Sequence, residues 1–164
     1  MNAAHVRLSG DDITQVFLPL FHTNAQSYSM LGSLWVGGTM VVQPRFSASR
    51  FWEVAIRNNC TWCSLIPFCV KALLAQDPPP DHSFRFWNPA VRMPEVEEAY
   101  GIRTYGWWGM TETITQGIVG DIDHPGPPRC IGRVAPGYDI EIRHEDGRHI
   151  KPGERGLLFI RGAR

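Results

Sequence analysis

Two tryptophans stand directly before a glycine and a group of polar side chains in the segment YGWWGMTETITQG, residues 105–117. Trp108 offers a flat aromatic face on which a nucleobase can stack, and Gly109 lets the backbone come close to a phosphate. Thr111 supplies a hydroxyl and Glu112 a carboxylate, which beside bound phosphates needs a divalent cation between them. The segment therefore predicts a nucleotide and metal site. The alternative is a buried strand end with a tight glycine turn, in which Thr111 caps the residues that follow.

The composition excludes several classes of protein. Of the 164 residues, 43% are hydrophobic and 20% are charged, and the formal net charge is zero, so nothing points to nucleic acid or an anionic membrane as a partner. No apolar run approaches the roughly 20 residues that span a bilayer, and the N-terminus lacks the apolar core of a signal peptide. We expect a cytoplasmic globular chain without a membrane span, forming one domain or part of a larger one.

Strand and helix patterns alternate along the first two thirds of the chain. Apolar residues recur at helical spacing in the segment 22–38, where Thr23 is a candidate cap and Gly37 a stop signal. Pro67 is placed to begin another helix. Such alternation predicts a parallel sheet flanked by helices, and ligands usually bind at the carboxyl ends of its strands. The predicted strands are 14–20, 39–43, 61–67, 84–88 and 102–108, and the predicted helices are 22–38, 47–59, 68–76 and 93–101.

The pattern changes after Gly117. Residues 139–143 alternate strictly between polar and apolar, an Asp146-Gly147 turn follows, and residues 157–161 form a second strand pattern. This predicts a hairpin-rich antiparallel meander. The expected fold class is α/β, a mainly parallel sheet with flanking helices followed by an antiparallel β-meander. We divide the chain into an α/β subdomain, residues 1–120, which the family resemblance described below implies to be acyl- and adenylate-binding, and a β-meander segment, residues 121–164.

The four cysteines do not form the pattern of a structural zinc site. Cys60 and Cys63 make one C-x-x-C pair, but only the scattered Cys69 and Cys130 remain to complete a second. We interpret them as buried free thiols of a reducing compartment.

The GMTET run in this setting resembles the adenylate-forming superfamily of acyl- and aryl-CoA ligases, luciferases and adenylation domains. The resemblance implies that Trp108 packs on adenine, Thr111 contacts the α-phosphate and Glu112 binds Mg²⁺, with Thr111 and Glu112 as the catalytic pair. Nucleotide contacts carry over onto the run from Trp107 to Thr111, including Gly109 and Met110, and onto the loop of Asn88, Pro89 and Ala90. The family more often has tyrosine at the position of Trp108.

A second segment, FLPLFHTNA at residues 17–25, resembles the family's strand–turn–helix motif in which an aromatic–histidine pair borders the acyl pocket. It implies that His22, Thr23 and Asn24 contact the substrate; a helix-start histidine bonded to backbone is the alternative for His22. The third segment, residues 130–162, resembles the glycine-rich meander after the Thr–Glu motif. As a set, the three segments are most similar to carnitine/crotonobetaine-type acyl-CoA ligases.

The resemblance implies an AMP-forming ligase that joins a carboxylate to coenzyme A with ATP and Mg²⁺. The family's Gly/Ser/Thr-rich phosphate loop and its catalytic lysine have no counterpart here, since neither Lys71 nor Lys151 lies in a matching context. We therefore expect a fragment of the large N-terminal domain that is inactive alone and self-associates through exposed apolar faces. The alternatives are a non-catalytic binding module of the same fold and part of an amino-acid-activating adenylation domain.

Overall fold

A five-stranded parallel sheet organises the first two thirds of the chain. The computed structural model describes residues 6–77, 79 and 81–162. The strand order is β2-β1-β3-β4-β5, and every pair is parallel. The strands are β1 Ile13–Val16, β2 Thr39–Val42, β3 Trp62–Ser64, β4 Phe86–Asn88 and β5 Arg103–Thr104. The predicted parallel α/β arrangement is confirmed.

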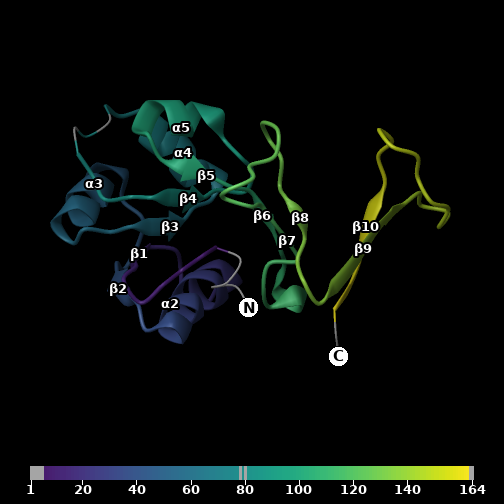
Figure 1. Cartoon of the computed structure of the whole chain (residues 1–164), viewed down its shortest axis with the longest axis horizontal. Coiled ribbons are helices and arrows are strands. Elements are labelled where there is room, and N and C mark those ends of the chain that lie inside the picture. Colours follow the sequence, from purple (N-terminus) through teal and green to yellow (C-terminus); the bar gives the residue numbers. More distant parts are fainter. Residues whose placement is uncertain (1–5, 78, 80, 163–164) are drawn as a thin grey trace.

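Helices cover both faces of this sheet (Figure 1). Successive strand residues point to opposite faces, so Cys63 and Trp87 enter one core with α3, α4 and α5, whereas Trp62 and Phe86 enter the other. The π-helix η1 contacts β1 and β3 and is continued by α2. The helices are η1 Asn24–Met30, α2 Leu31–Val36, α3 Ala48–Arg57, α4 Pro67–Leu74 and α5 Pro94–Tyr100.

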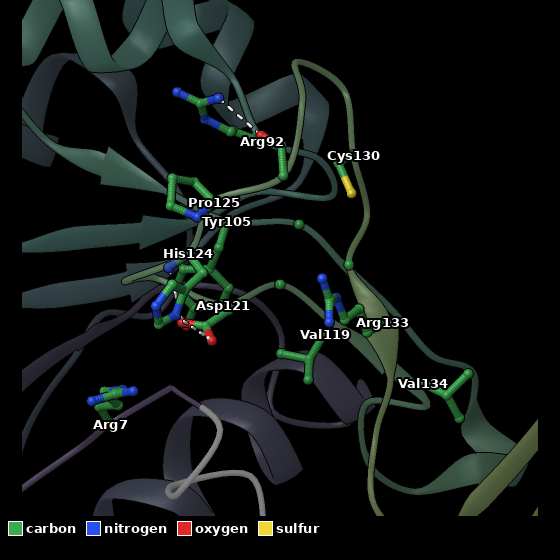
Figure 2. A pocket seen from close by; sticks show the side chains of 14 residues that line it. Arg7, Arg92, Tyr105, Val119, Asp121, His124, Pro125, Cys130, Arg133 and Val134 are labelled. Atoms are coloured by element: carbon green, nitrogen blue, oxygen red, sulfur yellow. Dashed lines mark hydrogen bonds and ion pairs between the residues drawn. The ribbon is translucent and has the colours of Figure 1, made fainter.

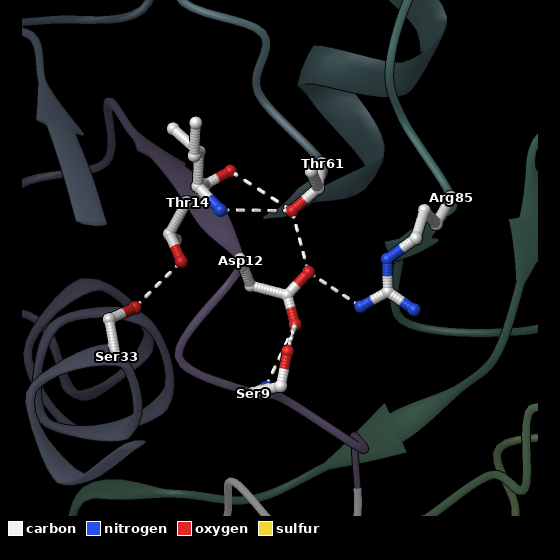
Figure 3. Close-up of polar contacts among 7 residues, drawn as sticks. Ser9, Asp12, Thr14, Ser33, Thr61 and Arg85 are labelled. Carbon is white, nitrogen blue, oxygen red and sulfur yellow. Dashed lines mark hydrogen bonds and ion pairs between the residues drawn. The ribbon is translucent and has the colours of Figure 1, made fainter. Parts of the chain in front are cut away.

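The segment predicted as one helix over 22–38 differs from that prediction in two ways. It begins as a π-helix, and Thr23 makes no capping hydrogen bond through its side chain. Its apolar stripe also faces outward, because Leu34 and Trp35 are 56% and 80% exposed. The buried side carries small and hydroxyl residues instead. Ser33 Oγ lies 2.6 Å from Thr14 Oγ1 of β1 (Figure 3). It also donates to the Ser29 carbonyl at 2.8 Å.

A buried carboxylate connects the segments that lead into the amino-terminal ends of β1, β3 and β4 (Figure 3). Asp12, only 3% exposed, accepts hydrogen bonds from the Ser9 amide at 2.9 Å and from Thr61 Oγ1 at 2.7 Å, and it pairs with the Arg85 guanidinium. Thr61 Oγ1 also accepts the Ile13 amide at 3.0 Å. Burial opposes ionisation of Asp12, but these hydrogen bonds outweigh it and hold its pKa below the ordinary value.

The strand predicted over 102–108 is divided between two sheets. β5 ends the parallel sheet, whereas β6, Trp107–Trp108, begins an antiparallel sheet with β7, Ile118–Val119, and β8, Arg133–Val134. Gly106 stands at the break, where a Cβ would lie 2.8 Å from the Ile131 carbonyl oxygen. A larger residue would push the crossing segment away.

The C-terminal segment forms a two-stranded antiparallel ribbon, as the alternation predicted. β9, Tyr138–Arg143, pairs with β10, Leu157–Gly162, and the ribbon projects away from the parallel sheet (Figure 1). Gly147 in the expected turn has φ 85°. The proposed boundary after residue 120 stays a prediction; β8, which lies beyond it, pairs with β7.

Three of the four cysteines are buried and none is in a disulfide. Burial raises the pKa of Cys60 and Cys69 to about 11 and that of Cys63 well above its ordinary value. Within the described ranges, no three His, Cys, Asp or Glu side chains come together as a metal-binding group. None of the helices in this part of the chain is both long and apolar enough to cross a membrane.

Candidate functional site

The two segments that the sequence analysis selected meet at one cavity of about 420 Å³. The start of η1 contributes His22, Thr23 and Asn24, the predicted substrate contacts. The β6–β7 hairpin contributes Trp107, Gly109, Met110 and Thr111, the predicted nucleotide contacts. The remaining described lining residues are Leu18, Pro19, Tyr28 and Ile66, so the lining that the structure describes contains no Lys, Arg, Asp or Glu. The cavity suits an uncharged or aromatic group.

Trp107 connects this cavity to the loop after β4. Its indole Nε1 donates to the Asn88 carbonyl at 3.0 Å, and its backbone amide donates to the Ala90 carbonyl at 3.2 Å. Its ring meets the Tyr28 ring edge-on, with centroids 5.1 Å apart and planes at 72°. The predicted Asn88–Ala90 loop is thereby fixed beside the hairpin.

Trp108 lies on the opposite side of the same strand. Its half-buried ring packs over Gly117, where a Cβ would lie 3.5 Å from Trp108 Cζ3. Because neighbouring strand residues point to opposite faces, the cavity beside η1 includes Trp107 but not Trp108. Glu112, which lies beyond the strand, does not line this cavity either. β6 thus presents one tryptophan to the cavity and the other to the far side of the hairpin.

Tyr28 occupies the space above Gly109. A Cβ on Gly109 would collide with the Tyr28 hydroxyl and lie 2.9 Å from the Thr115 carbonyl oxygen. Burial raises the pKa of Tyr28 to about 12, and the nearby Tyr138 adds to the shift, so the Tyr28 hydroxyl stays protonated at neutral pH. Sequence reasoning missed Tyr28, because a tyrosine within a helical pattern carries no local signal of contact with a hairpin 80 residues away.

Thr111 and Glu112 lie on the short 3₁₀ turn η2, Thr111–Thr113, at the tip of the hairpin. Both residues are exposed, and neither side chain has a hydrogen-bond or ion-pair partner within the described residues. Mg²⁺ is usually held by one or two carboxylates together with substrate phosphates rather than by a protein cage. A single free carboxylate beside a free hydroxyl fits that mode.

One lining side chain is buried without a polar partner. Asn24 is 8% exposed, and its Nδ2 and Oδ1 atoms find no hydrogen-bond partner among the residues that the structure describes. Buried amides are normally paired. Asn24 also begins a π-helix, a form that occurs frequently at functional sites. Both features distinguish it from an ordinary helix-start residue.

A larger cavity, of about 560 Å³, lies between the end of the parallel sheet and the β7–β8 pair (Figure 2). It contains none of the predicted site residues, and three of its charged side chains are already paired. Arg92 is bonded to Glu97 and to the Gly126 carbonyl, Arg7 pairs with Asp123, and Asp121 pairs with His124. The cavity beside η1 is therefore the stronger candidate despite its smaller volume.

Comparison with known proteins identifies the family of this chain. A sequence model described as AMP-binding enzyme matches residues 1–164. The chain belongs to this family. It is 35% identical over 166 residues to a crotonobetaine/carnitine–CoA ligase of Salmonella arizonae, a match that covers 94% of this chain and 32% of the ligase. The predicted resemblance to the adenylate-forming superfamily and to this type of acyl-CoA ligase is confirmed.

Solved structures share the fold. A benzoate CoA ligase from Burkholderia xenovorans LB400 superposes with a TM-score of 0.88 at 21% identity, over 99% of this chain and 35% of that one. The O-succinylbenzoate coenzyme A synthetase of Bacillus subtilis, in complex with ATP and magnesium ion, gives a TM-score of 0.77 at 24% identity, over 98% of this chain and 35% of that one. The chain spans about a third of the length of the curated relatives it matches.

Proposed function

We propose that this chain supplies the acyl-binding wall and part of the adenylate site of an AMP-forming acyl-CoA ligase. In that reaction a carboxylate oxygen attacks the α-phosphorus of ATP and expels pyrophosphate, and the thiol of coenzyme A then displaces AMP to give the thioester. The observation that carries the proposal is the meeting of His22–Asn24 with Trp107–Thr111 at one cavity. The reaction brings one anion to another, so alignment and charge neutralisation dominate its barrier.

Most of the predicted residues have a place in this scheme, and Trp107, predicted as a nucleotide contact, is assigned to the acyl side instead. The Thr111 hydroxyl would donate to the α-phosphate, and Glu112 would hold Mg²⁺, which neutralises phosphate charge when bound. Trp108 would stack on adenine, with Asn88, Pro89 and Ala90 at its edge. His22, Thr23 and Asn24 would border the acyl chain opposite Trp107. The Bacillus synthetase was solved with ATP and magnesium ion, the two ligands that this scheme requires; the choice of Glu112 rests on the family resemblance.

Magnesium-dependent nucleotide binding tests this assignment. Glu112→Gln should weaken Mg·ATP binding in calorimetry by roughly tenfold or more, as the loss of one charged contact predicts, and should abolish its dependence on Mg²⁺. Glu98→Gln, at another exposed carboxylate without a partner in the described chain, is the matched control. Trp108→Ala should weaken binding by roughly 5- to 150-fold through lost stacking, and Trp107→Ala much less.

The same assays separate the alternatives. A non-catalytic binding module would bind its partner equally well with or without Mg²⁺ and would ignore Glu112→Gln. An amino-acid-activating domain would need acceptors for the N–H donors of an α-ammonium, and the unpartnered Asn24 Oδ1 at the cavity border is one such acceptor. This alternative is tested by comparing amino acids with simple carboxylic acids as ligands.

Turnover by these 164 residues alone is not expected. Losing one electrostatic group from a preorganised site commonly costs about 10²–10³ in rate, and neither Lys71 nor Lys151 lies among the residues of the cavity. ATP–pyrophosphate exchange should stay at background with any carboxylate. Clear carboxylate-dependent exchange would overturn this part of the proposal.

A further inference from the structure

The turn that carries Thr111 and Glu112 has an unusual backbone. Ile114, which follows it directly, has φ 59° and ψ −35°, and its side chain is 68% exposed. A β-branched residue at positive φ is a genuine outlier. Such a conformation persists only where the surroundings impose it, and the exposed Ile114 side chain does not supply that constraint.

Thr113 supplies the constraint from inside the turn. It is 7% exposed, and its Oγ1 accepts the Met110 amide at 3.0 Å. The same oxygen lies 2.8 Å from the Met110 carbonyl and 2.7 Å from the Thr115 carbonyl, which share its single proton. One buried hydroxyl thus connects both sides of the turn.

The constraint from outside comes from the β9–β10 ribbon. Tyr138, the first residue of β9, donates its hydroxyl to the Thr113 carbonyl at 2.6 Å. Its ring packs against Gly162 of β10, its strand partner. A Cβ built on Gly162 would lie 3.2 Å from Tyr138 Cε1. The bond spans 25 residues of sequence and links the C-terminal ribbon to the turn.

We propose that Tyr138 is a positioning residue, whose hydroxyl bond to the Thr113 carbonyl holds the turn in the shape that presents Thr111 and Glu112. The positioning of Glu112 toward a metal–nucleotide ligand rests on the proposed function; the ordering of the turn does not. The β9–β10 ribbon would thereby stabilise the turn of the site, although no ribbon residue lines the cavity beside η1.

Tyr138→Phe removes the bond and keeps the ring. Hydrogen exchange of the backbone amides of Thr113 and Ile114, which donate to Met110 and Thr111, should become roughly 2- to 12-fold faster, the effect of one net hydrogen bond. The β9–β10 amides should exchange as in wild type. Tyr100→Phe is the matched control, because the Tyr100 hydroxyl also donates to a carbonyl at 2.6 Å, that of Leu73, far from the turn.

A second readout separates positioning from general stability. Mg·ATP binding should weaken in Tyr138→Phe at fixed Mg²⁺ and recover partly at saturating Mg²⁺, whereas Tyr100→Phe should lower the unfolding midpoint without changing either quantity. Thr113→Val should accelerate amide exchange at the turn as Tyr138→Phe does, whereas Thr113→Ser, which keeps the hydroxyl, should leave the exchange rate as in wild type. Unchanged exchange at Thr113 and Ile114 in Tyr138→Phe would overturn the positioning role. Wild-type protein that binds no Mg·ATP, with accelerated exchange in the variant, would overturn the proposed function and support the positioning role.

Discussion

Replacing Gly109 by alanine tests the packing between η1 and the β6–β7 hairpin. An added methyl group meets the Tyr28 hydroxyl, the Thr115 carbonyl oxygen at 2.9 Å and the Gln116 Cα at 3.4 Å. Gly109 has no positive φ, so the objection to alanine is lack of space and not backbone conformation. Two of the three neighbours are backbone atoms, which cannot turn aside.

The expected cost follows from this crowding. Overpacking by one methyl group typically destabilises by about 1–3 kcal/mol. Part of the collision comes from the Tyr28 hydroxyl, so Gly109→Ala should cost less in a Tyr28→Phe background. A coupling energy of roughly 0.5–1.5 kcal/mol is expected for two side chains in direct contact. The contact with the Thr115 carbonyl remains in the double variant, so removing the Tyr28 hydroxyl should relieve only part of the destabilisation.

Urea unfolding of the two single variants and the double variant measures this cycle. Gly32→Ala is the control, since a methyl group there meets only the end of the Leu8 side chain at 3.4 Å, and alanine inside a helix is favoured by about 0.5–1 kcal/mol. It should be neutral or stabilising. Equal costs for Gly109→Ala with and without the Tyr28 hydroxyl would refute the proposed contact.

Three further predictions concern the rest of the molecule. Asp12→Asn should lower the unfolding free energy by about 2–3 kcal/mol at pH 7, because hydrogen bonds to a buried charge are lost. Since the folded-state pKa of Asp12 is depressed, the stability that its charge contributes is present above the ordinary pKa of 3.8 and is lost as the pH falls below that value. Urea unfolding should therefore show a smaller difference in unfolding free energy between wild type and variant at low pH. With pKa values of about 11 for Cys60 and Cys69, a thiol reagent at pH 8 should modify at most Cys130 in the folded chain and four thiols after unfolding. Trp35→Lys, at a residue 80% exposed, should reduce the self-association that we expect in sedimentation; a wild-type monomer at high concentration would contradict it.

Local signals were sufficient for most elements of the parallel sheet. Pro67 begins α4 as its position predicts, and Gly37 ends α2 with φ 72°. Whether the apolar face of α2 is buried or exposed could not be predicted in the same way. Periodicity identifies a set of residues on one face, but what that face meets is decided by the partner surface. Here the sheet presents Thr14, so the hydroxyl of Ser33 is buried and Trp35 is not.

The division of the predicted strand over 102–108 has a tertiary cause. The run IRTYGWW is locally continuous, but residues 130 and 131 cross against Gly106, and a Cβ there would meet the Ile131 carbonyl. The two residues in contact are 25 positions apart, so a local sequence pattern around Gly106 does not indicate the contact. The same holds for the bond from Tyr138 to Thr113.

The two tryptophans show how far sequence could define the candidate site. Strand alternation alone requires Trp107 and Trp108 to face opposite sides, and the family resemblance selects Trp108 for the nucleotide. Only the fold shows that the other side is occupied by Tyr28 and closed into a cavity with His22–Asn24. In the proposed function, the ring of Trp107 would be a wall between the acyl group and the sheet, anchored through Asn88, while Trp108 lies on a separate surface. One strand two residues long would then divide the proposed acyl side of the site from the proposed nucleotide side, and the turn after it places Thr111 at the cavity border, where the proposed reaction would take place.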